Sequence, residues 1–224
     1  MPARSVPLVT GQYYHIFNRG INKQPIFKGV RDYKRALEVL EFYSYNPPLR
    51  FSKYLLLSRE VKQDFWKNVK KANKQIVGIV CYCFMPNHFH LLLRQRQENG
   101  ISIFVGNLQN SYTRYFNTKY DLAGPLLQGQ FKAVRIEDDD QLLHLSRYIH
   151  LNPYTSYVVK GIDDLINYPW SSFGEYTGQV NSGIFEKEVI LSHFASINKY
   201  KEFVADQADY QRELDRIKHL AIEK

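Results

Sequence analysis

Two hydrophobic patterns alternate along most of this chain. Short apolar or alternating runs predict β-strands, and apolar residues spaced three and four apart predict amphipathic helices. A further helix is predicted after Asp138, Asp139 and Asp140, whose carboxylates suit the positive end of a helix dipole. The strand pattern is found at residues 13–18, 76–84, 88–94 and 131–136, and the helical pattern at residues 30–45, 59–73 and 101–118.

The order of these elements is strand, helix, strand, strand, helix, strand. This order is typical of a ferredoxin-like α+β fold, in which helices flank an antiparallel sheet. The run at residues 77–80 and the strand that begins at His88 are expected at the centre of the sheet. Met85-Pro86-Asn87 joins them, because proline and asparagine favour a turn. We expect one main domain at residues 1–178 and a charged helical C-terminal extension at residues 179–224.

Charge and composition narrow the class of partner. The 224 residues include 30 Lys and Arg against 22 Asp and Glu, and the net charge of +8 with a pI near 9.3 favours a polyanion. The hydrophobic fraction of 44% can build a core, but no apolar run approaches the roughly 20 residues of a membrane span. The N-terminus lacks the apolar core of a secretory signal, and Cys81 and Cys83 lack a second pair for zinc. We therefore expect a cytoplasmic protein with reduced cysteines and no membrane partner.

The candidate chemistry begins on the strand at residues 88–94. His88 and His90 flank Phe89, so the two imidazoles point to one face of the strand and Phe89 points to the other. At about 3.3 Å per residue the two side chains lie roughly 7 Å apart, close enough to converge on one metal ion. The pair therefore predicts a metal site. His15, on the first strand, has two interpretations, a place near this site or a place in the core, and the core is favoured.

A second group of candidates lies toward the end of the helix that follows Asp140. Tyr148 and Asn152 are four residues apart and share one helical face. A metal pair on a strand and an exposed tyrosine on a helix together suggest DNA cleavage through a tyrosyl phosphodiester. Asn152 has a second interpretation, a cap at the helix end before Pro153. His150 lies about 200° around the helix from Tyr148, so we expect it to be structural or to face DNA.

Five stretches of the sequence, taken together, carry a family resemblance. In them the chain resembles the single-tyrosine HUH transposases, which are insertion-sequence transposase-like proteins, and among these the REP-associated tyrosine transposases. The resemblance spans about residues 13–178, and residues after about 180 have no part in it. The stretches are Tyr14-His15-Ile16-Phe17-Asn18-Arg19-Gly20 with Ile26-Phe27, Met85-Pro86-Asn87-His88-Phe89-His90-Leu91-Leu92, Gly129-Gln130-Phe131-Lys132, Arg147-Tyr148-Ile149-His150-Leu151-Asn152-Pro153, and Trp170-Ser171-Ser172-Phe173 with Glu175-Tyr176.

The resemblance implies a ferredoxin-like catalytic domain that cleaves and rejoins single-stranded or hairpin DNA during transposition. His88, His90 and Asn152 would bind a divalent cation, Mg²⁺ or Mn²⁺, for which imidazoles and an amide oxygen are suitable ligands. Tyr148 would attack a phosphodiester, which leaves a 5′-phosphotyrosine and a free 3′-hydroxyl. Lysines between residues 53 and 74 form a second basic region that would suit a duplex stem. The residues expected to bind DNA lie in or beside the motifs: Arg19, Arg94, Arg114, Lys132, Arg135 and Arg147.

Three other functions compete with this one. A nucleotide hydrolase of the histidine-triad type would need a third histidine, where this chain has Leu92. A non-catalytic hairpin-binding protein derived from a transposase would need none of His88, His90 and Tyr148. Plasmid relaxases and rolling-circle initiators share the chemistry but usually carry three histidines or a second tyrosine. The favoured hypothesis is a nucleoid-associated DNA transposase, monomeric or homodimeric.

Overall fold

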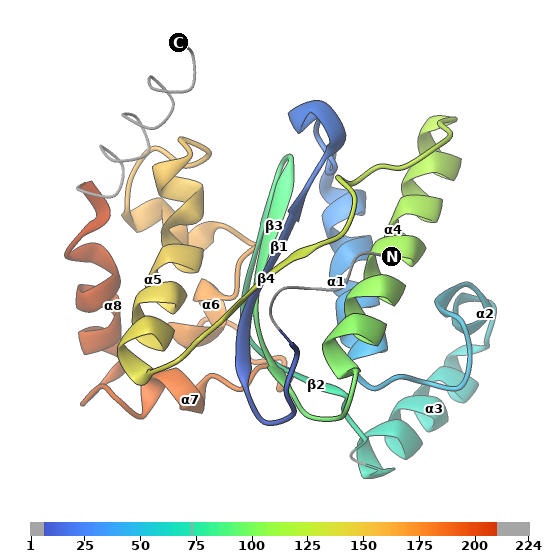
Figure 1. Ribbon diagram of the computed structural model, residues 1–224, viewed down its shortest axis with the longest axis horizontal. Coiled ribbons are helices and arrows are strands. Elements are labelled where there is room, and N and C mark those ends of the chain that lie inside the picture. The colour runs from blue at the N-terminus through green and yellow to red at the C-terminus, as the bar shows by residue number, and fades with distance from the viewer. Residues whose placement is uncertain (1–6, 73, 210–224) are drawn as a thin grey trace.

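An antiparallel sheet forms the middle layer of the protein (Figure 1). The computed structural model describes residues 7–72 and 74–209, and within them four strands form this sheet in the order β2-β3-β1-β4. Helices cover both faces, so the predicted α+β fold with a helix-flanked antiparallel sheet is confirmed. The strands are β1 (Tyr13–Arg19), β2 (Val77–Met85), β3 (His88–Gln95) and β4 (Lys132–Arg135).

The two middle strands are β1 and β3, not β2 and β3. β1 pairs with β3 on one side and with β4 on the other, so the central position predicted for residues 77–80 is wrong. β2 is nevertheless buried at every residue, because a later segment covers its outer edge. Phe84 donates its N–H to the Trp170 carbonyl over 2.8 Å, and an isolated bridge joins Cys83 to Ser171. The continuous apolar run of β2 therefore reflects burial on both faces rather than a central place in the sheet.

Each face of the sheet has its own layer of helices (Figure 1). α1 (Val30–Ser44) and α4 (Gly100–Tyr120) pack on one face, and α5 (Asp139–Thr155) packs on the other. Alternation along β1 matches this division, because Tyr14 and Ile16 are buried in the core under α1 and α4. The remaining elements are α2 (Phe51–Leu55), α3 (Arg59–Ala72), α6 (Phe173–Tyr176), α7 (Glu188–Leu191), α8 (Ile197–Ala205) and two 3₁₀ turns at Ile21–Lys23 and Asp163–Asn167.

Helix α5 begins as predicted and ends later than predicted. The Asp138 carboxylate caps its start by accepting the Gln141 N–H over 2.7 Å. Pro153 lies inside the helix, which continues to Thr155. Asn152 is thus an interior helical residue, 3% exposed, and its interpretation as the cap before Pro153 is wrong. Its amide is free of a capping role and is turned toward the sheet.

Helices α7 and α8 pack on the α5 side of the sheet (Figure 1). Ile190 of α7 and Tyr200 and Val204 of α8 are buried in the same hydrophobic cluster as the inner side chains of α5. The domain boundary at residue 178 stays a prediction, and the last part of the predicted extension, residues 210–224, lies outside the described residues. Within the described part of the chain, α7 and α8 form the outer support of α5. No helix found there is long and apolar enough to cross a membrane.

Both cysteines are packing residues of this second cluster. Cys81 and Cys83 are free and fully buried, as expected. Burial raises the pKa of both thiols, so neither is a thiolate at neutral pH.

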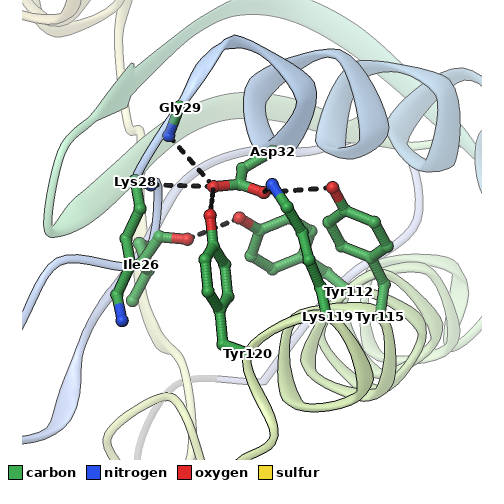
Figure 2. Close-up of polar contacts among 8 residues, drawn as sticks. All are labelled: Ile26, Lys28, Gly29, Asp32, Tyr112, Tyr115, Lys119 and Tyr120. Carbon is green, nitrogen blue, oxygen red and sulfur yellow. Dashed lines mark hydrogen bonds and ion pairs between the residues drawn. The ribbon is translucent and has the colours of Figure 1, made fainter.

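On the opposite face, a buried carboxylate joins α1 to α4 (Figure 2). Asp32, with 0% exposure, accepts the backbone N–H groups of Lys28 and Gly29 over 2.8 and 3.0 Å. From α4, the hydroxyls of Tyr115 and Tyr120 donate to it over 3.0 and 2.7 Å, and Lys119 forms an ion pair with it. Burial alone raises the pKa of the Asp32 carboxyl, but the hydrogen bonds from Lys119, Tyr120 and Lys28 outweigh it, so the pKa lies below the usual 3.8.

Asp32→Asn should lower the free energy of unfolding by about 2 kcal/mol at neutral pH, because Lys119 loses its charge partner and one oxygen acceptor is lost. The lowered pKa means that the carboxylate stabilises the fold fully above pH 3.8 and loses this effect as the pH falls through the folded-state pKa. The difference in free energy of unfolding between wild type and variant should therefore become smaller in acid. Urea unfolding at several pH values measures it. Glu38→Gln, at an exposed carboxylate that pairs with Arg35, is the control and should change stability little. A gap that does not change with pH would contradict the assignment.

Candidate active site

Side chains from β1, β3 and β4 line a cavity on the α5 face of the sheet. In the register, Phe17 lies opposite His90 and Arg19 opposite His88, and Lys132 of β4 lies opposite Phe17. Directly opposed residues project to the same face, so these groups converge. The cavity has a volume of about 250 Å³ and is lined by Phe17, Asn18, Arg19, His88, His90, Gln128, Gln130, Lys132 and Tyr148.

The two histidines of β3 lie close together, and the Nδ1 atom of each contacts a neighbouring side chain. Their ring centroids are 5.0 Å apart, edge to face. His88 Nδ1 lies 2.6 Å from Asn87 Oδ1, and the Asn87 amide nitrogen donates to the Lys23 carbonyl, which fixes the oxygen toward His88. Because an amide oxygen only accepts, Nδ1 of His88 is the donor in this contact. His90 Nδ1 is held in turn, 2.9 Å from His15 Nε2.

Helix α5 brings the second pair of predicted residues to the same place. Asn152 Oδ1 lies 3.2 Å from His88 Nε2, and the Tyr148 ring centroid lies 5.4 Å from that of His90. Tyr148 is half-buried and lines the cavity, so its phenol borders the space that a substrate would enter. The structure thus brings together the four residues for which the sequence predicted catalysis and metal binding.

The donor set suits a hard divalent cation. Neighbouring ligands of an octahedral Mg²⁺ at about 2.1 Å are about 3 Å apart, close to the 3.2 Å between His88 Nε2 and Asn152 Oδ1. His88, His90 and Asn152 could therefore hold such an ion. Among residues 7–72 and 74–209 there is no group of three or more His, Cys, Asp or Glu arranged for a metal. The third group beside His88 and His90 is instead the amide oxygen of Asn152.

Burial keeps the inner histidines neutral, which is the form that binds metal. It lowers the pKa of His15 to about 4. The pKa of His90 is held well below its ordinary value, first by burial and then by the neighbouring His88, His15 and Arg19. Both imidazoles are therefore uncharged at neutral pH, and His90, which lines the cavity, adds no positive charge to it.

His15 belongs to this site, although the sequence favoured a place for it in the core. Its contacts with His90 and its ring centroid 6.1 Å from that of Tyr148 correct that expectation. The signal available in the sequence was alternation, which puts His15, Phe17 and Arg19 on one face of β1. The register of β1 against β3, which brings this face beside His90, joins residues about 75 positions apart and leaves no local trace.

Only two of the six predicted DNA-binding residues lie at the cavity, namely Arg19 and Lys132. Arg94 lies near the far end of β3, opposite Tyr13, with its guanidinium over the Tyr13 ring. Arg135 lies at the far end of β4 and forms an ion pair with Glu137 at 3.6 Å. Both are on the strands that build the cavity but at the other end of them.

The last two predicted DNA-binding residues lie elsewhere. Arg147 is 4% exposed and turned toward α8, with its guanidinium 4.4 Å from the centre of the Phe203 ring and 2.6 Å from His144 Nδ1. A buried arginine held in this way does not offer its charge to DNA. Arg114 is exposed on α4, on the other side of the sheet from the cavity. It lines a groove of about 580 Å³ together with Arg35 and Arg50.

His150 is structural and does not face solvent. It is fully buried, and burial lowers its pKa to about 3. Its two ring nitrogens contact Tyr200 and Ser172, so the alternative that it faces DNA is wrong.

Comparison with known proteins finds a family with which this arrangement shares sequence similarity. Residues 49–152 match the family model described as "Transposase IS200 like". Over these residues, just under half of the chain, the protein is similar to the IS200-like transposases. The match includes β3 and most of α5, and thereby His88, His90, Tyr148 and Asn152. This similarity agrees with the resemblance drawn from the motifs.

The fold agrees over a larger part of the chain. A solved structure of a REP-associated tyrosine transposase bound to a REP hairpin superposes with a TM-score of 0.56 at 13% sequence identity. The match covers 88% of this chain and 92% of that one, so the two proteins share a fold over most of their length. No curated protein gives a significant match.

Proposed function

We propose that this protein is an IS200-like DNA transposase, a metal-dependent single-strand DNA endonuclease and strand transferase that acts on hairpin DNA through a 5′-phosphotyrosine intermediate. One observation carries the proposal: Tyr148 borders the same 250 Å³ cavity as His88 and His90, and Asn152 contacts His88. A nucleophile beside two imidazoles and an amide oxygen is the set of groups that a metal-assisted phosphoryl transfer needs.

In the proposed cleavage step, the Tyr148 phenolic oxygen attacks the phosphorus of a single-stranded phosphodiester. The new bond joins that oxygen to phosphorus, and the bond between phosphorus and the 3′-oxygen breaks. The proton lost by the phenol is balanced by the proton that the leaving 3′-oxygen gains as a hydroxyl. Because the linkage to tyrosine is itself a phosphodiester, a 3′-hydroxyl can attack it and release Tyr148. Rejoining or strand transfer therefore needs no nucleotide cofactor.

The same cavity residues account for substrate orientation. His88, His90 and Asn152 would hold Mg²⁺ or Mn²⁺. When bound, such an ion polarises the scissile phosphate and neutralises the charge that develops on it. Arg19 and Lys132 lie at the cavity wall and would hold the phosphates on either side of the cleaved bond. Unpaired DNA fits this role because its backbone can bend toward Tyr148.

A paired stem would lie outside the cavity. The related transposase structure is bound to a REP hairpin, which supports a hairpin as the substrate here. Arg114 and the lysines of α3, such as Lys67 and Lys71, are exposed and distant from the cavity, so we assign them to the stem's phosphates. Arg147, because it is buried, is left out of this set.

A hairpin with an unpaired flank should bind more tightly than a fully paired duplex of equal length and charge, by about tenfold or more. Phosphates are available on both molecules, but only unpaired bases can be stacked and read at their edges. Salt should weaken both complexes, because both release counterions, and the preference should remain. Filter binding at several salt concentrations, with mapping of nicks on the labelled strand, measures both affinity and cleavage position.

Cleavage is expected in the unpaired flank and not in the stem.

Lys132→Met should weaken cleavage more than binding, since one phosphate contact of several is lost at the cavity. Lys201→Met removes an equal charge from α8, far from the proposed substrate path, and serves as the matched control. Equal affinity for hairpin and duplex at every salt concentration, without a site-specific nick, would reduce the protein to a basic nucleic-acid binder.

A further inference from the structure

A buried polar network lies on the side of α5 that faces away from the cavity. His150, with 0% exposure, has its Nδ1 atom 2.7 Å from the Tyr200 hydroxyl of α8 and its Nε2 atom 2.8 Å from Ser172 Oγ. Both ring nitrogens are therefore satisfied, one as donor and one as acceptor. A buried imidazole with two partners is held in one orientation, because turning it would leave polar groups without hydrogen bonds.

The partners of His150 are themselves fixed to different layers. Ser172 Oγ accepts the Tyr82 N–H of β2 over 2.9 Å, and the Ser172 N–H donates to the Tyr82 carbonyl over 3.0 Å. The Tyr200 hydroxyl also donates to Ser146 Oγ over 3.3 Å, one turn earlier on α5. The imidazole thus connects α5 to the sheet on one side and to α8 on the other.

His150 stands midway between the two functional residues of α5. Tyr148 precedes it by two residues and Asn152 follows it by two, which corresponds to about 200° of rotation in each direction. Both side chains consequently lie on the opposite side of the helix from His150. Any rotation of α5 about its axis moves all three together.

Small rotations would matter at the cavity. A phenolic oxygen about 8 Å from a helix axis moves about 3 Å when the helix turns by about 20°. A misplacement of about 1 Å at a reacting group can cost about 100-fold in rate. The aromatic rings around His150, those of Phe173 and Tyr176, provide packing but no directional bond to it. Directional restraint at this point comes from the two hydrogen bonds.

We infer that His150 is a positioning residue: through Ser172 and Tyr200 it sets the rotation of α5 and so aligns Tyr148 and Asn152 with His88 and His90. This inference rests on the proposed function. It also gives α8 a role in the reaction, because the Tyr200 hydroxyl is half of the restraint. Loss of the network should misalign the nucleophile and one metal ligand without touching the surfaces that bind DNA.

The test compares variants that keep the core filled. His150→Phe retains an aromatic ring but removes both hydrogen bonds, His150→Gln keeps a donor and an acceptor, and Tyr200→Phe removes one oxygen. Tyr168→Phe is the matched control, because it also deletes one buried hydroxyl, bonded to the Phe84 carbonyl and not to α5. Each protein is checked for folding by circular dichroism and assayed well below its melting temperature.

Three quantities are measured: the single-turnover rate of covalent adduct formation, the Kd for hairpin DNA, and the Kd for Mn²⁺ without DNA. We expect His150→Phe to slow adduct formation by about 30-fold or more and to weaken Mn²⁺ binding by about tenfold, with hairpin Kd within about twofold. Tyr200→Phe should slow the reaction by about three- to tenfold. His150→Gln should recover most of the rate, and Tyr168→Phe should match wild type.

The outcomes separate the two claims. Absence of an adduct with the wild-type protein would count against the proposed function itself. A wild-type adduct with unchanged rates in folded His150→Phe and Tyr200→Phe would overturn the inference and leave the function in place. If Tyr200→Phe and Tyr168→Phe slow the reaction equally, the cause is a general loss of stability, and the inference about His150 is also overturned. If His150→Phe does not fold, Tyr200→Phe against Tyr168→Phe decides alone.

Discussion

Tyr148→Phe should abolish the covalent protein–DNA adduct and leave hairpin binding within about twofold of wild type. The substitution removes one oxygen atom, the proposed nucleophile, and keeps the ring that packs beside His90. Because Tyr148 is the one hydroxyl-bearing residue among those that line the cavity, the rate of adduct formation should fall by a factor of about 10⁴ or more. Affinity should persist, since phosphate contacts by basic side chains provide most of it.

The measurement is incubation of purified protein with end-labelled hairpin DNA carrying an unpaired flank, in Mg²⁺ or Mn²⁺, followed by denaturing electrophoresis. Tyr154→Phe is the matched control on the same helix, because its hydroxyl contacts Asp209 and not the cavity. It should form the adduct at the wild-type rate. An adduct of undiminished intensity in Tyr148→Phe would assign the nucleophile to another residue.

The strand and helix periods predicted most of the site's framework. Alternation around Phe89 placed His88 and His90 on one face, and a spacing of four placed Tyr148 and Asn152 on one face of a helix. These are local properties of the chain, and the structure has both faces directed at one cavity. Helices α1, α3 and α4 were predicted within about two residues at each end for the same reason. Helix α2 was not predicted, because its five residues are too few to show a helical period.

Relations between distant segments were not predictable in this way. His15 was assigned to the core, because the register that sets it against His90 depends on pairing between β1 and β3. The place of β2 at the sheet edge was missed because the segment around Ser171 buries it as thoroughly as a neighbouring strand would. Burial is a local signal in sequence, but the identity of the covering segment is not.

Position in a motif also proved a poor guide to the direction of a cationic side chain. Arg147 is adjacent to Tyr148 in sequence, and the 100° turn per helical residue directs it to Phe203 of α8 instead. Arg94 shares the strand face of His88 but lies six residues along it, roughly 20 Å away. Arg19 and Lys132 reach the cavity because β1 and β4 end and begin beside it. For charged residues, distance along an element mattered more than membership of a motif.

His88→Ala and His90→Ala should each reduce cleavage by a factor of about 10³ or more, with hairpin Kd within about threefold of wild type. Each change removes one of the proposed ligands, and the loss of several kcal/mol of charge stabilisation at the phosphate accounts for the factor. Binding should survive because cationic side chains, and not the ion, hold most of the backbone. Cleavage gels and titrations with Mn²⁺ followed by electron paramagnetic resonance measure activity and metal binding separately.

Chelation should reproduce the effect of these substitutions and be reversible. Excess EDTA should stop cleavage by the wild-type protein, and added Mn²⁺ should restore it. In the two alanine variants, added Mn²⁺ should restore cleavage only in part, because one ligand is missing. His193→Ala, at an exposed histidine after α7, controls for weak surface binding of the ion and should behave as wild type. Cleavage that continued at full rate in excess EDTA would contradict a metal-assisted reaction. Wild-type Mn²⁺ affinity in both alanine variants would instead place the ion away from β3, even if cleavage were lost.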